Sequence, residues 1–184
     1  MAGTIGRMLR ARRAGERATA WFRPGLEGPD VIRVTSPAFA DGQPIPMRHA
    51  GPGVGENVSP ALAWTGVPSG AAELVLIVED PDAPLRHPFV HVAIAGVPAT
   101  VSGFDEGALN RHQRPFGTGR GGFGRPGYTG PRPVAGHGVH HYAFQLFAVD
   151  VPLELPEGAA PGDIFEALET HVIARGRLTG TYER

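Results

Sequence analysis

The 184-residue sequence contains no cysteine, no lysine and no long apolar run. Without cysteine the chain cannot form disulfides, thiolate metal sites or a cysteine nucleophile. No apolar stretch approaches the ~18 residues that cross a bilayer, and the basic N-terminus lacks the apolar segment of a secretory signal. All 17 basic residues are arginine. We attribute this to codon bias and infer no function from it. These absences predict a soluble, cytoplasmic protein.

The net charge of -1 provides no overall field that would attract nucleic acid. A hydrophobic content of 41% in a chain of this length suits one domain with a sizeable core. The 27 glycines and 19 prolines make up a quarter of the chain and are interleaved with apolar segments. Such interleaving is typical of the turns in a strand-rich fold.

Positive charge is concentrated at the N-terminus, where residues 1–24 hold six arginines and a single acid. Apolar residues at loosely helical intervals across 4–22 predict a helix. That helix either contacts a membrane surface or an acidic partner, or packs on its own domain or on a second subunit; the alternative is a disordered segment. We therefore divide the chain into an arginine-rich extension and linker, 1–30, and one domain, 31–184.

Short apolar segments separated by turn residues predict a mainly β fold. One helix is expected over 163–175, with Asp163 as its N-cap, an apolar face and Gly176 as its end. The expected fold is an antiparallel β-sandwich with this C-terminal helix and a candidate N-terminal helix. The strands are expected at 31–39, 60–64, 74–78, 91–97, 142–151 and 178–182.

Chemically suggestive residues follow the aliphatic segment 74–78, which is typical of a strand buried on both faces. Asp80-Pro81-Asp82-Ala83-Pro84 ends it, and its two prolines force the chain out in a nearly fixed shape. His91 opens the next apolar segment, which we expect to pair with 74–78. Asp80, Asp82 and His91 can therefore converge on one site.

A second cluster, GPRPVAGHGVHHY, spans residues 130–142. Its glycines leave backbone N–H groups accessible, and His137, His140 and His141 add donors, a combination suited to binding an oxyanion. The three histidines lack a recognised zinc-ligand spacing, and no all-oxygen cage for a hard cation is evident. We predict no metal and no cofactor.

Several motifs together resemble the phosphatidylethanolamine-binding proteins, and most closely their bacterial and archaeal Raf kinase inhibitor-like branch. These are DPDAP with a histidine eleven residues after its first aspartate, and a later G-x-G-x-H-x-Y that leads into an aromatic strand. NVSPALAW at 57–64, FGRPGY at 123–128 and the C-terminal HVIARGRLTGTYER also fit that branch. The resemblance covers residues 31–184.

This resemblance implies a small anion pocket at one edge of the sandwich. It also implies a cis Ala83–Pro84 bond, ligands such as phosphate, phosphoethanolamine-like headgroups or carboxylates, and for bacterial relatives a homodimer. The sequence departs from the branch at Phe89-Val90, where tryptophan is usual, and at His141, where arginine is common. The pocket residues implied are Asp80, Asp82, Pro84, His91, Pro133, Gly136, His140 and Tyr142.

Carboxylates in an anion pocket need a physical account, because an ionised Asp80 would repel phosphate by ~4 kcal/mol at 4 Å. We expect an aspartate to orient His91 or His140, or to share a proton with the ligand. We expect Asp82 to bind N–H groups of its own loop.

Three functions remain open from the sequence. The first is a non-enzymatic anion-binding protein that modulates a kinase or another partner. The second is an enzyme that uses Asp80 with His91 or His140 as an acid–base pair. The third is an interaction protein that acts through its basic N-terminus.

Overall fold

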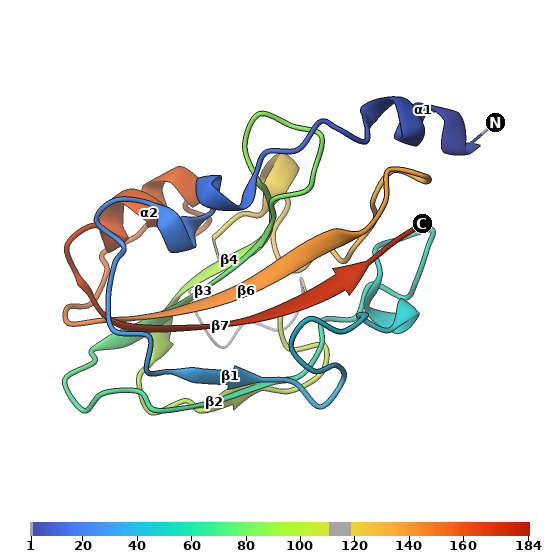
Figure 1. Ribbon diagram of the computed structural model, residues 1–184. Coiled ribbons are helices and arrows are strands. Elements are labelled where there is room, and N and C mark those ends of the chain that lie inside the picture. Colours follow the sequence, from blue (N-terminus) through green and yellow to red (C-terminus); the bar gives the residue numbers. More distant parts are fainter. Residues whose placement is uncertain (1, 111–118) are drawn as a thin grey trace.

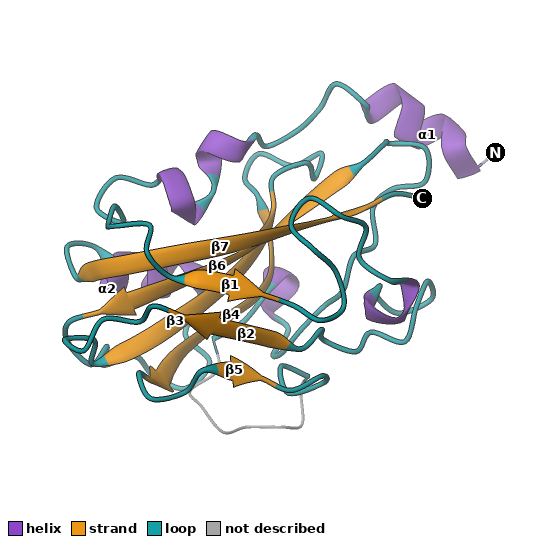
Figure 2. Ribbon diagram, turned by 60° about the horizontal axis from the view of Figure 1, so that its bottom comes forward, coloured by secondary structure: helices purple, strands orange, loops and turns teal. Residues whose placement is uncertain are grey.

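The computed structural model describes residues 2–110 and 119–184, and in it two antiparallel sheets face each other (Figures 1 and 2). The larger sheet has the order β4-β3-β6-β7 and the smaller one the order β1-β2-β5. The predicted mainly β class with two helices is confirmed. The strands are β1 (Arg33–Thr35), β2 (Leu62–Thr65), β3 (Glu73–Asp80), β4 (Phe89–Pro98), β5 (Gly103–Phe104), β6 (His140–Val149) and β7 (Val172–Tyr182).

Strand β3 lies in the middle of the larger sheet and is buried along its whole length. Leu74, Leu76 and Val78 point into the core between the two sheets. Val75 and Ile77 point to the opposite face, where they join a second core that includes residues of α2 (Pro161–Leu168). The uniformly aliphatic sequence follows from this double burial, because strands covered on both faces do not alternate.

The C-terminal helix is shorter than the sequence predicts, since α2 ends at Leu168 and β7 begins at Val172. The chain reverses at Thr170, which has a left-handed φ of 71°. Gly176 was expected to end a helix but lies inside β7. A Cβ there would come within 1.9 Å of the Ile32 carbonyl oxygen, so only glycine fits.

The expected N-terminal helix over 4–22 is also shorter. Helix α1 covers Ala2–Leu9, and the chain then runs over the outer face of the larger sheet with two short 3-10 turns, Glu16–Ala18 and Ala20–Phe22 (Figure 1). Gly15, with a φ of 95°, separates the helix from these turns. The helical spacing of the sequence therefore does not correspond to one continuous helix.

The sheet beneath these turns carries two buried polar side chains that bind them. The Ala20 N–H donates to Glu79 Oε2 at 2.7 Å, and the Trp21 N–H donates to Gln145 Oε1 at 2.8 Å. The Gln145 amide also donates to the same Glu79 oxygen. Burial raises the pKa of Glu79, although these hydrogen bonds oppose the shift. The N-terminal segment thus supplies partners for polar groups that would otherwise be buried without them.

Candidate functional site

The site begins where β3 ends, at Asp80, which is 4% exposed. Its Oδ1 accepts a hydrogen bond from the Asp82 N–H at 2.8 Å, which fixes the start of the DPDAP loop. The peptide bond between Ala83 and Pro84 is trans. The cis bond implied by the family resemblance is therefore wrong for this chain.

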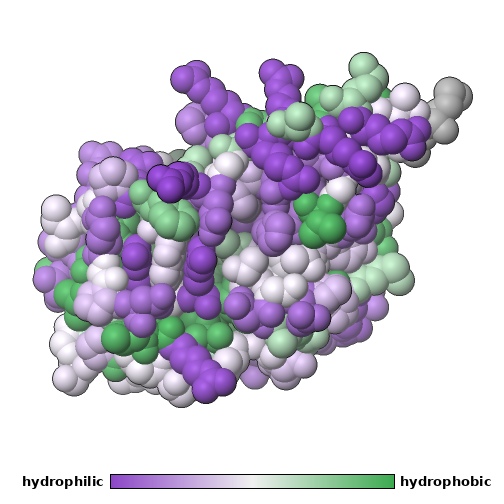
Figure 3. Space-filling model, in the orientation of Figure 1, coloured by the Kyte–Doolittle hydropathy of each residue, from purple (hydrophilic) through white to green (hydrophobic). Residues whose placement is uncertain are grey.

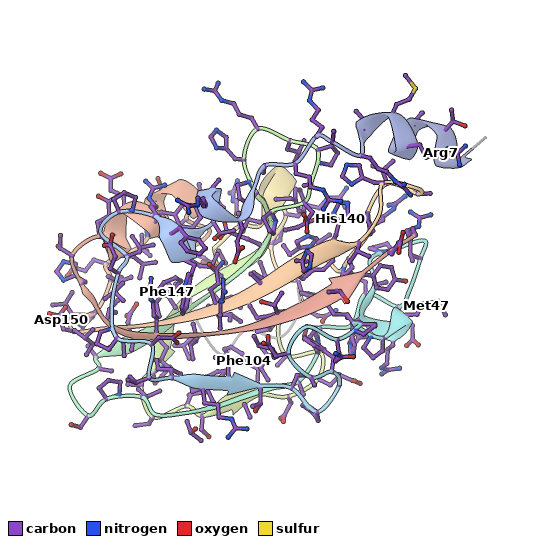
Figure 4. All side chains as sticks on the ribbon, viewed as in Figure 1. Arg7, Met47, Phe104, His140, Phe147 and Asp150 are labelled. Atoms are coloured by element: carbon purple, nitrogen blue, oxygen red, sulfur yellow. The ribbon has the colours of Figure 1, made fainter. Side chains whose placement is uncertain are left out.

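The other Asp80 oxygen begins a chain of hydrogen bonds through two histidines. Asp80 Oδ2 lies 2.7 Å from Nδ1 of His140, which is the first residue of β6 and is labelled in Figure 4. His140 Nε2 lies 2.7 Å from Nδ1 of His137. His137 Nε2 in turn lies 2.8 Å from the carbonyl oxygen of Leu9 and 3.2 Å from that of Arg12. The chain links β3 to the N-terminal segment.

The protons in this chain can be counted from its two ends. Carbonyl oxygens only accept, so His137 Nε2 must carry a hydrogen. The bond between the two rings requires a second hydrogen, and the bond between His140 and Asp80 requires a third. Three hydrogens shared among two imidazoles and one carboxylate leave Asp80, His140 and His137 with no net charge. The additional proton offsets part of the repulsion expected between Asp80 and a bound anion.

His91 forms the adjoining part of the site. It is buried, and its Nδ1 donates to the carbonyl oxygen of Thr129. Its ring packs edge-on against Phe89 and Tyr142, with centroids 4.8 and 5.0 Å away. Burial lowers the pKa of His91, although Asp80 opposes the shift, so at neutral pH the ring is uncharged. His91 Nε2 is then a buried acceptor, and the described residues offer it no hydrogen-bond partner.

These groups line a cavity of about 360 Å³. Its polar side is formed by Asp80, His91 and His140, and its apolar walls come from both sequence clusters. The cavity therefore lies between the DPDAP loop and the segment before β6, as the sequence predicts for the two clusters. The remaining lining residues are Pro52, Ala83, Pro84, Leu85, Phe89, Gly122, Arg125, Thr129, Gly130, Arg132, Pro133 and Val134.

Arg125 and Arg132 provide the positive charge at this cavity. Both side chains belong to exposed residues. Within residues 2–110 and 119–184 neither guanidinium forms an ion pair. Arg125 and Arg132 therefore place two positive charges at the cavity that no described carboxylate pairs with.

Asp82 lies outside the cavity and belongs to a separate cluster. Its Oδ2 accepts from both the backbone N–H and Nδ1 of His141, each at 2.7 Å, and its Oδ1 pairs with Arg13. Burial alone would raise the pKa of Asp82, but the His141 hydrogen bonds and Arg13 more than offset it, so the pKa is lowered. The expectation that Asp82 binds N–H groups of its own loop is wrong. The branch that the sequence resembles commonly has arginine at the position of His141. In this chain the guanidinium beside that position comes from Arg13.

Five of the eight predicted pocket residues line the cavity, namely Asp80, Pro84, His91, Pro133 and His140. Tyr142 lies behind the cavity against His91, with a neutral hydroxyl whose pKa is raised by burial. Gly136 contacts the N-terminal segment, because a Cβ there would lie 2.7 Å from the carbonyl oxygen of Gly3.

Sequence reasoning missed Leu85, Arg125 and Arg132 as lining residues, and Arg13 as the partner of Asp82. Arg13 lies outside the segment that carries the family motifs. Arg125 occurs inside the FGRPGY motif, which was the only signal available for it. In the described part of the chain, no three His, Asp or Glu side chains are placed to hold a metal ion.

The fold and the cavity define a mainly β protein with a pocket lined by histidine, aspartate and arginine, and comparisons identify its family. The phosphatidylethanolamine-binding protein family model matches residues 35–183. A UPF0098 protein of Methanothermobacter thermautotrophicus is 41% identical over 80% of this chain and 95% of its own length. The E. coli protein YbcL superimposes with a TM-score of 0.78 and 31% identity over 84% of this chain and 99% of YbcL. The chain belongs to the phosphatidylethanolamine-binding protein family.

A third relative bears on location. LppC of Mycobacterium tuberculosis, which is described as a lipoprotein, is 40% identical over 84% of this chain and 73% of its own length. Among the described residues, no helix is long and apolar enough to cross a bilayer. The cytoplasmic location predicted from the sequence stays a prediction.

Proposed function

We propose that the chain is a non-enzymatic binding protein whose cavity takes a small oxyanion, either free or on a phosphorylated headgroup. The observation that carries this proposal is the buried, unpartnered Nε2 of His91 beside the exposed Arg125 and Arg132. A buried polar atom without a partner costs about 1–3 kcal/mol. A ligand that reaches His91 would recover that cost and neutralise the arginines.

The acceptor character of His91 restricts the ligand. A neutral His91 accepts a hydrogen bond at Nε2, so the ligand must bring a donor, such as the P–OH of singly protonated phosphate or the ammonium of phosphoethanolamine. Alternatively, His91 itself takes up a proton when the anion binds. Whether phosphate brings its own P–OH or His91 takes up a proton, one proton is bound together with the phosphate. The name of the matched family supports the phosphoethanolamine class.

Binding is favoured over acid–base catalysis by the surroundings of His140. Asp80 and His140 form a close pair, but His140 Nε2 is occupied by His137 and does not face a substrate position. Of the described residues that line the cavity, none is a serine, cysteine or lysine. We include in the proposal the expectation from the family resemblance that ligand occupancy modulates a partner such as a kinase.

Calorimetric titration with phosphate, phosphoethanolamine and acetate tests the proposal. Changing Arg125→Gln together with Arg132→Gln should weaken phosphate binding by about tenfold or more. The matched control, Arg17→Gln with Arg33→Gln, removes the same charge from exposed positions outside the cavity and should bind as wild type does. Absence of wild-type binding to all three compounds would rule out the proposed function.

A further inference from the structure

Helix α1 packs on the body through its glycines. A Cβ on Gly6 would lie 2.1 Å from the carbonyl oxygen of Ala135 and 2.6 Å from the backbone nitrogen of His137. A Cβ on Gly136 would lie 2.7 Å from the carbonyl oxygen of Gly3. Helix α1 therefore approaches residues 135–137 so closely that no side chain fits at Gly6 or Gly136.

Two of the three large apolar side chains of α1 are exposed, and the third, Leu9, is half-buried. Ile5 is 64% exposed and Met8 is 80% exposed. A helix on the surface of a soluble domain normally buries its apolar residues and exposes its small and polar ones. Figure 1 shows α1 projecting past the edge of the larger sheet, and Figure 3 shows hydrophobic groups exposed there beside strongly hydrophilic ones. The orientation of this helix is the reverse of the usual one.

Three arginines are close to these apolar side chains in the sequence, and none of them has an acidic partner among the described residues. Arg7, Arg10 and Arg12 are all exposed, and no ion pair within the described residues includes them. Arg10 donates only to the Gly136 carbonyl oxygen, at 3.3 Å. The exposed residues Ile5, Met8, Arg7, Arg10 and Arg12, which we call the α1 face, thus combine apolar side chains with unpaired positive charge.

We propose that the α1 face is a reversible docking site for an anionic phospholipid surface. Such a surface offers phosphate groups for the arginines and acyl chains for Ile5 and Met8, which is the pattern of an interfacial amphipathic helix. A second copy of the chain is a poorer occupant. A symmetric contact through this face would place the three arginines against the same three arginines.

The location of the α1 face would bring the cavity close to the lipid surface. Helix α1 packs on residues 135–137, immediately after the cavity residues Arg132, Pro133 and Val134. The Leu9 carbonyl at the end of α1 accepts the His137 hydrogen bond that continues to His140. Docking through α1 does not require an occupied cavity, so this proposal stands apart from anion binding.

Sedimentation of the full chain with vesicles tests the proposal. Wild type should bind mixed phosphatidylcholine–phosphatidylglycerol vesicles and not pure phosphatidylcholine vesicles, and added salt should weaken binding. Changing Ile5→Gln together with Met8→Gln should lower the partition coefficient by about tenfold. Met47→Gln is the matched control, because Met47 is 67% exposed and lies apart from α1 (Figure 4).

Arginine variants separate local from overall charge. Arg7→Gln with Arg12→Gln should lower vesicle binding about tenfold, and Arg17→Gln with Arg33→Gln should lower it much less. The proposal is overturned if wild type does not bind anionic vesicles or if test and control variants bind equally. It is also overturned if phosphate at matched ionic strength displaces the vesicles. Light scattering that shows a dimer dissociated by the Ile5 and Met8 changes, without vesicle binding, would assign the face to a second copy.

Discussion

His137 Nδ1 and His140 Nε2 are joined by a 2.7 Å hydrogen bond that lets two histidines balance the charge of one buried carboxylate. His140 contacts Asp80 directly, but a neutral His140 donating from Nδ1 would leave the carboxylate charge in place. His137 supplies the second ring that holds the additional proton. The pocket accommodates Asp80 beside an anion because this pair offsets its charge.

Changing His137→Phe should therefore weaken phosphate binding about tenfold. The free energy of unfolding should fall by about 1–3 kcal/mol, since His140 Nε2 is left buried without a partner. Titration calorimetry measures the first effect and urea unfolding the second. His171→Phe, at an exposed histidine paired with Asp150, should leave phosphate affinity unchanged.

Changing Asp80→Asn should alter phosphate affinity by less than about threefold, because the unit is already neutral with aspartate. The asparagine amide can donate to His140 Nδ1, which leaves every other bond in the chain formed without the extra proton. If Asp80 carried an unbalanced charge, its removal would relieve ~4 kcal/mol of repulsion and increase affinity by about a thousandfold. Calorimetry separates the two outcomes clearly.

Phosphate affinity should decrease as pH rises above neutrality, by up to about tenfold per unit, because one proton accompanies the bound anion. Burial lowers the pKa of His91, so that proton is absent from the free site at neutral pH. Calorimetry in buffers of different ionisation enthalpy would measure the proton uptake. An affinity that did not change with pH would contradict the proposed role of His91.

The lowered pKa of His91 also affects stability: lower pH should increase phosphate affinity but decrease the free energy of unfolding. An unfolded His91 is protonated below pH 6.5, and the folded residue resists protonation. Without ligand, the contribution of His91 to the free energy of unfolding should therefore decrease as pH falls below 6.5.

Two glycine substitutions test the C-terminal structure. Gly176→Ala should destabilise the protein by several kcal/mol. Gly176 lies inside β7, and the added methyl group would clash with the carbonyl oxygen of Ile32. Gly162→Ala should stabilise it by about 0.5–1 kcal/mol, because that position lies in α2 with nothing within 4 Å of the added carbon. Thermal or urea unfolding measures both. Equal effects at the two positions would contradict the strand assignment for Gly176.

The sequence predicts the buried strand β3 and the convergence of its end with the histidine cluster, because uniform aliphatic runs and prolines have few structural alternatives. It does not separate helix from strand at Val172 and Ile173, where β-branched residues also satisfy a helical spacing. Arg125 and Arg132 lie in a glycine-rich span without periodicity. Their place at the cavity depends on tertiary packing that no local pattern records.

The hydrogen bonds from Ala20 and Trp21 to Glu79 and Gln145 join the N-terminal segment to the larger sheet. The family model begins at residue 35, yet Glu79 and Gln145 of the larger sheet accept hydrogen bonds from backbone N–H groups that precede it. A variant that lacks residues 1–30 would retain the cavity residues but would expose Glu79, Gln145 and the neighbouring aliphatic side chains to solvent. We therefore expect the N-terminal segment to contribute to the stability of the larger sheet, although it precedes the residues that the family model matches.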